Sequence, residues 1–210
     1  MGLVFPIAVQ NLMTALVSAS DAFMLGFVNQ TSLSAVSLAT QVQFVHNLFM
    51  LALTIGATTL AAQYWGKGDT DSVEEILAIA LKISMAVSFV FFAAALCTPG
   101  MLMRIFTDDT ELIEAGIPYL RIVSSSYLFL GFSQIYLCIM KNSGRTAKST
   151  VYGSVAVVVN IVLNAVFIFG LAGIPAMGIA GAALATTVSR GMELALTLYE
   201  NTLRSQVCIR

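Results

Sequence analysis

The sequence predicts an all-α, polytopic membrane protein, a bundle of six transmembrane helices. Of its 210 residues, 58% are hydrophobic and only 10% are charged, whereas soluble domains carry about 25% charged residues. The mean hydropathy is +0.89. Uncharged stretches long enough to cross roughly 30 Å of bilayer hydrocarbon recur along the chain. These features exclude a disordered chain and an ordinary soluble enzyme.

The first expected span contains a single charge, Asp21. The uncharged stretch that follows, residues 22–66, is too long for one span, and the polar run at 29–32 divides it. Pro118 opens the fourth expected span at a first-turn position, where a missing N–H costs nothing. The single predicted lobe, residues 1–210, therefore has spans at residues 3–28, 33–63, 76–97, 118–140, 149–170 and 177–199, without a second lobe.

The distribution of Lys and Arg predicts the orientation of these spans, because cytoplasmic loops carry the excess of basic residues. With the N-terminus inside, the cytoplasmic segments hold Lys67, Lys141, Arg145, Lys148, Arg204 and Arg210, and the outer ones hold Arg104 and Arg121. We therefore expect a multi-pass protein of the plasma (inner) membrane with both termini cytoplasmic. No basic segment precedes the first span, so a signal peptide is not expected.

Several function classes have no support. Ten Lys+Arg against eleven Asp+Glu give a net charge of −1, so no nucleic-acid partner is expected. The segment 66–69 lacks the glycine and the Ser/Thr of a phosphate-binding loop and is interpreted as a turn. The three cysteines suggest neither disulfides nor a metal site. With no catalytic motif, we expect neither an enzyme nor a cofactor.

Asp21 is the main candidate functional residue. It lies seven residues from the outer end of its span, roughly 10 Å below the outer boundary. A carboxylate at that depth is expensive unless it faces a polar cavity, and intramembrane acids are functional by default. The alternative is an error in the span boundary that leaves Asp21 at the membrane surface.

Three further polar residues are expected at a similar depth. Asn160 and Asn164 share one helix face because they are four residues apart, and they lie about 16 and 10 Å below the outer end of their helix. Thr186 lies about 13 Å below the outer end of the last span. Together with Asp21 they offer the oxygen ligands of an alkali cation, or a proton acceptor. Asparagines in membranes also serve as inter-helix hydrogen bonds, which remains the alternative.

Other features are interpreted as packing. The small-residue segment 178–185 allows close helix approach. His46 is expected to be hydrogen-bonded within the bundle. Arg190 and Glu193, three residues apart, are expected to pair within one helix.

Several short motifs follow one another in a fixed order along the chain. They are DAFMLG at 21–26, AQYWGKGD at 62–69, NSGRT at 142–146, NIVLN at 160–164, FIFG at 167–170 and GIAGAALAT at 178–186. This ordered series resembles the N-terminal lobe of the multidrug and toxic compound extrusion (MATE) family of cation-coupled exporters, and the resemblance extends over about residues 2–193.

The resemblance implies an antiporter with twelve helices in two lobes, which exports small molecules such as organic cations or drugs. The coupling ion is H⁺ or Na⁺, and its site includes an acid of the first helix, onto which Asp21 maps. Polar residues of the fifth helix and a threonine of the sixth match Asn160, Asn164 and Thr186. Because only one lobe is present, the chain is a truncated or half-length form, or it pairs as a parallel homodimer.

Two alternatives from other classes remain. One is a lipid-linked glycan flippase of the same superfamily, whose cavity displays several basic residues. The deep cations expected here are only Lys82 and Arg121. The other is an inactive or partner-dependent membrane fragment.

Overall fold

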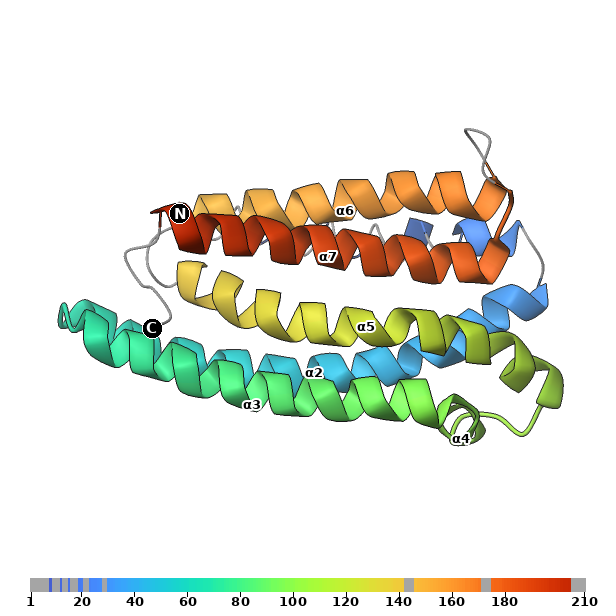
Figure 1. Cartoon of the computed structure of the whole chain (residues 1–210), viewed down its shortest axis with the longest axis horizontal. Helices are drawn as coiled ribbons and strands as arrows, with labels where there is room; N and C mark the ends of the chain where they lie inside the picture. The colour runs from blue at the N-terminus through green and yellow to red at the C-terminus, as the bar shows by residue number, and fades with distance from the viewer. Residues whose placement is uncertain are drawn as a thin grey trace.

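The computed structural model describes residues 8, 12, 15, 19–20, 23–27, 30–141, 146–170 and 175–204. Within these ranges the chain is helical and contains no strand, so the predicted all-α class is confirmed. The helices, labelled as in Figure 1, are α2 (Gln30–Gly66), α3 (Thr70–Cys97), α4 (Pro99–Arg104), α5 (Thr110–Met140), α6 (Thr146–Phe169) and α7 (Gly178–Arg204).

The helices form two pairs with α5 between them (Figure 1). In that view α6 and α7 lie side by side, and α2 and α3 lie on the other side of α5. Two hydrophobic clusters occupy opposite ends of the bundle. One joins the start of α2 and the end of α3 to α4, α5 and α7, and the other joins the end of α2 and the start of α3 to the end of α5 and the start of α6.

The expected turn between α2 and α3 is confirmed. Gly68 adopts φ +75°, which L residues with a side chain rarely adopt. Asp69 then caps α3, because its carboxylate accepts hydrogen bonds from the Ser72 backbone N–H at 3.1 Å and from its hydroxyl at 2.7 Å. These hydrogen bonds lower the pKa of Asp69 below its usual value, and the bond from the Ser72 hydroxyl contributes most.

The predicted start of the helix at Pro118 is wrong. α5 begins at Thr110, and Pro118 lies inside it. The start is fixed by Asp109, whose carboxylate accepts the Glu111 backbone N–H at 2.9 Å. The polar residues that follow extend the helix beyond its apolar part. The short helix α4 was also not expected; it follows α3 directly, with Thr98 between them and Pro99 in its first turn.

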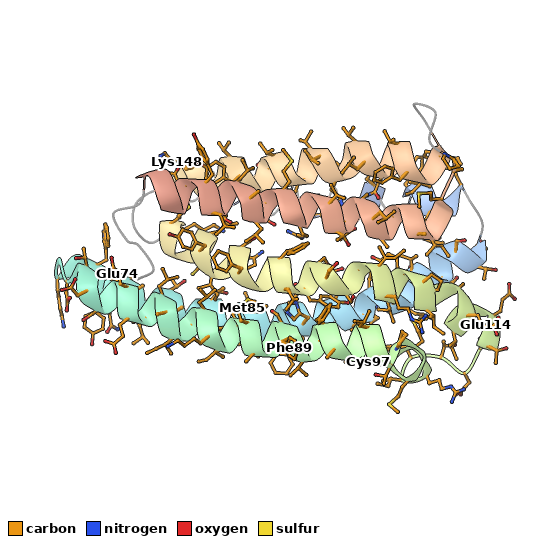
Figure 2. All side chains as sticks on the ribbon, viewed as in Figure 1. Glu74, Met85, Phe89, Cys97, Glu114 and Lys148 are labelled. Atoms are coloured by element: carbon orange, nitrogen blue, oxygen red, sulfur yellow. The ribbon has the colours of Figure 1, made fainter. Side chains whose placement is uncertain are left out.

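The exterior of the bundle is suited to lipid. Phe89, in the second half of α3, is 60% exposed, and many other large apolar side chains of α2, α3 and α6 are also exposed. Both ends of the bundle carry charged residues: Figure 2 shows Glu74 and Lys148 at one end and Glu114 at the other. By length and composition, α2, α3 and Lys148–Phe169 of α6 can each cross a membrane. The six-span count remains a prediction, since most of residues 3–28 lie outside the described ranges.

The small-residue segment at the start of α7 packs against α6, as predicted. A Cβ atom added to Gly181 would lie 2.6 Å from the Phe167 carbonyl oxygen. The same carbonyl accepts the Met177 backbone N–H at 2.9 Å. The two helix backbones therefore approach each other at a point where only glycine fits.

Candidate functional site

A cavity of about 590 Å³ lies between α2, α5, α6 and α7. Most of its polar lining comes from the middle of these helices rather than from their ends. Its hydrogen-bonding side chains include Ser37, Thr40, Gln41, Gln43, Asn47, Thr54, Gln134, Asn160, Thr186 and Ser189. Among the described residues, the charged ones that line it are Arg190 and Glu193. Polar side chains at this depth are rare in membrane helices unless they face a cavity or a partner.

Asn160 and Asn164 lie on the same face of α6, as their spacing predicts, and both are buried. Asn164 Nδ2 donates to Asn160 Oδ1 at 3.1 Å. Asn160 Nδ2 in turn donates to Ser189 Oγ of α7 at 3.2 Å. The pair therefore also links two helices, so its role as an inter-helix hydrogen bond is present in the structure.

Thr186 lines the same cavity as Asn160. Its hydroxyl donates to the Ala182 carbonyl at 3.1 Å, which leaves the oxygen lone pairs available to a ligand. Ser189 Oγ donates to the Thr186 carbonyl at 2.9 Å. Ser189 thus connects Thr186 to the asparagine pair in one hydrogen-bonded network. The fourth predicted residue, Asp21, lies outside the described residues.

The expected Arg190–Glu193 pair is present on α7. Arg190 Nη1 donates to Glu193 Oε2 at 2.8 Å. Both side chains line the cavity, which sequence spacing alone did not indicate, because the rotation of a helix about its axis is set by its packing.

Lys148, expected only to fix the topology, has a buried partner. Its Nζ lies 2.7 Å from Glu200 Oε1, and the Tyr152 hydroxyl donates to Glu200 Oε2 at 2.8 Å. Glu200 is 2% exposed. This cluster joins the start of α6 to the end of α7 and lies outside the cavity lining.

His46 has the packing role that the sequence suggested. It is fully buried, with Nε2 3.1 Å from Ser88 Oγ of α3. Its ring packs against Phe91 and Tyr127, with centroids 5.0 and 5.2 Å away. It does not line the cavity.

A bundle of long helices, several of them able to cross a membrane, around a polar cavity has the architecture of one lobe of a membrane transporter. The MatE family model matches residues 6–166. The chain belongs to this family, as the resemblance of its motifs implied.

The chain is 26% identical over 200 residues to the Thermotoga maritima "Probable multidrug resistance protein NorM", covering 94% of this chain and 42% of that protein. It is 29% identical over 191 residues to the Photobacterium profundum "Multidrug resistance protein NorM", covering 89% and 41%. The chain thus spans less than half the length of these relatives, whose names are those of transporters rather than enzymes.

Solved structures share the fold. A MOP superfamily transporter from Pyrococcus furiosus matches with a TM-score of 0.89 at 21% identity, over 99% of this chain and 46% of that one. An outward-facing multidrug resistance MATE family transporter matches with a TM-score of 0.88, also at 21% identity, over 99% and 45%. The fold is therefore that of a half-length MATE lobe.

Proposed function

We propose that the chain is one lobe of a cation-coupled exporter that moves small molecules, organic cations or drugs, out of the cell. Membership of the MatE family and the multidrug resistance names of its relatives support this function. The observation that carries the proposal is the shared position of Asn160 and Thr186 on one cavity. The second lobe is supplied by another chain segment or by a second copy in a parallel homodimer.

The coupling site in this proposal consists of Asp21, Asn160, Asn164 and Thr186, with H⁺ or Na⁺ as the coupling ion. Similar distances of the three described residues from the helix ends support this grouping. Asn164 and Asn160 lie about 8 and 14 Å from the Phe169 end of α6, and Thr186 lies about 12 Å from the adjoining Gly178 end of α7. In an exporter, binding of the coupling ion at such a layer is linked to the release of the substrate.

Efflux measured in a pump-deficient bacterial host tests the function. The chain is expressed alone and together with the C-terminal half of the Photobacterium relative. Efflux of two probes from energised cells, the cation ethidium and the carboxylate 2-naphthoate, is followed by fluorescence. We expect efflux that stops when the driving gradient is collapsed, by a protonophore for H⁺ or by equal Na⁺ concentrations for Na⁺. The C-terminal half alone is the control. Absence of efflux from cells in which both halves reach the membrane would reject the exporter in favour of an inactive subunit.

The proposed orientation places both termini in the cytoplasm of a cell whose inner membrane the lobe spans. Lys67 follows α2 and Lys148 lies in the first turn of α6, both at one end of the bundle, whereas Asp109 caps α5 at the other. The predominance of basic loops assigns the first end to the cytoplasm.

Cysteine accessibility checks this orientation. In a background in which Cys97, Cys138 and Cys208 are replaced by serine, a single cysteine replaces Lys67, Lys148 or Asp109. A membrane-impermeant maleimide applied to intact cells should label only position 109. Labelling of position 148 from outside contradicts the proposed orientation.

A further inference from the structure

The cavity is lined by one charged pair, which lies in the middle of α7. Of the described residues that line it, only Arg190 and Glu193 are charged. Arg190 lies twelve residues after Gly178 and fourteen before Arg204, the ends of α7, so it is roughly 18–21 Å from either end. Charged residues at such a depth are rare and mark the pathways of substrates and ions.

The accessible charge of the pair is positive. The side chain of Glu193 is 3% exposed, whereas that of Arg190 is 29% exposed. Lys141, at the end of α5, also interacts electrostatically with Glu193. Because the carboxylate of Glu193 is covered and the guanidinium of Arg190 is partly exposed, the guanidinium is the charged group that a molecule in the cavity meets.

Most of the hydrogen-bonding capacity of Arg190 is unused within the described part of the chain. A guanidinium has five N–H donors, and one of them binds Glu193. The remaining planar edge fits a carboxylate in a bidentate arrangement. The rest of the lining is mixed, with apolar side chains such as Phe44 and Leu130 beside the amides of Gln41 and Gln134.

We propose that Arg190 is a substrate-binding residue that receives the carboxylate of an amphiphilic molecule, either an aromatic or aliphatic carboxylate or a zwitterion. The inference narrows the cargo of the same cavity from organic cations or drugs to small molecules that carry a carboxylate, and so rests on the proposed transport function. One guanidinium matches one carboxylate. A lipid pyrophosphate carries several negative charges and needs more cations than the described lining provides.

Binding of three naphthalene probes that differ only in charge tests the proposal. The probes are 2-naphthoate, 2-naphthalenemethanol and 2-naphthylmethylammonium, titrated by calorimetry into the full chain in lipid nanodiscs, with empty nanodiscs subtracted. We expect naphthoate to bind at least tenfold more tightly than the alcohol. Arg190→Gln should remove this preference, and Arg190→Lys should retain part of it because lysine offers a point charge without the planar fork.

The pair also predicts an inversion of selectivity. With Arg190→Gln, Glu193 loses its hydrogen-bonded cation, so the ammonium probe should bind more tightly than it does to the wild type. Glu193→Gln should instead strengthen naphthoate binding, because it removes a repulsive carboxylate and leaves the guanidinium in place. Arg121→Gln is the matched control, since Arg121 is an exposed arginine of α5 outside the cavity lining, and it should change neither affinity.

The opposing interpretation is that Arg190 only neutralises a buried acid. In that case Arg190→Gln lowers thermal stability, the double variant with Glu193→Gln restores it, and naphthoate affinity stays within twofold in both. That result overturns the inference while leaving the exporter intact. Loss of gradient-driven efflux together with intact, Arg190-dependent naphthoate binding would instead reject the transport function alone.

Discussion

Replacing Gly181 by alanine is expected to destabilise the folded lobe by about 3 kcal/mol or more, at the upper end of overpacking substitutions. The new Cβ would lie 2.6 and 2.7 Å from the carbonyl oxygen and carbon of Phe167. Both atoms belong to the backbone of α6, so no side-chain rotation relieves the contact. α6 and α7 must separate, which also disturbs the bond between Asn160 and Ser189.

The measurement is the unfolding midpoint of the purified protein in detergent, where we expect a decrease of at least about 6 °C. Gly56→Ala is the matched control, because Gly56 also lies inside a long helix and a Cβ there has no neighbour within 4 Å. That substitution should leave the midpoint unchanged or raise it, since alanine favours helix over glycine. Equal midpoints for the two variants contradict the close approach of α6 and α7.

Hydropathy in the sequence was sufficient to place four of the long helices. α2, α3, α6 and α7 begin or end within a few residues of their expected spans, because the apolar stretches and the polar runs between them coincide with the helices. The start of α5 could not be found in this way. Residues 110–117 are helical because Asp109 caps them, and a cap is a local hydrogen bond that hydropathy does not report.

The candidate site was predictable where one helix determined it. The shared face of Asn160 and Asn164 follows from the helical period. Ser189 was missed, since serine is common in these helices and its contact with Asn160 depends on how α7 is rotated against α6. The same applies to Lys148 and Glu200, which are 52 residues apart. Contacts of this kind depend on the register between helices, which packing decides.

Replacing Asp21 by asparagine is expected to abolish transport and to show which residues act with it. Without its charge, the site should bind the coupling cation roughly ten- to hundredfold more weakly, as for loss of a charged hydrogen-bond partner at about 1.5–3 kcal/mol. Efflux driven by an imposed gradient should fall to the level of protein-free vesicles. Asn160, Asn164 and Thr186 then supply only neutral ligands, which compensate less of the cost of burying a cation than a carboxylate does.

A double-mutant cycle with Asn164→Ala separates a shared site from inter-helix packing. The readout is the increase in unfolding midpoint that the cation produces, because a ligand stabilises the folded state that binds it. If Asn164 belongs to the site, Asn164→Ala reduces this increase when Asp21 is present and changes nothing further after Asp21→Asn. If Asn164 only takes part in hydrogen bonds that hold α6 and α7 together, Asn164→Ala lowers the free energy of unfolding by about 0.6 kcal/mol in both backgrounds. The cation-induced increase in midpoint then persists. That second outcome would show that Asn164 does not act with Asp21, and it would remove Asn164 from the proposed coupling site.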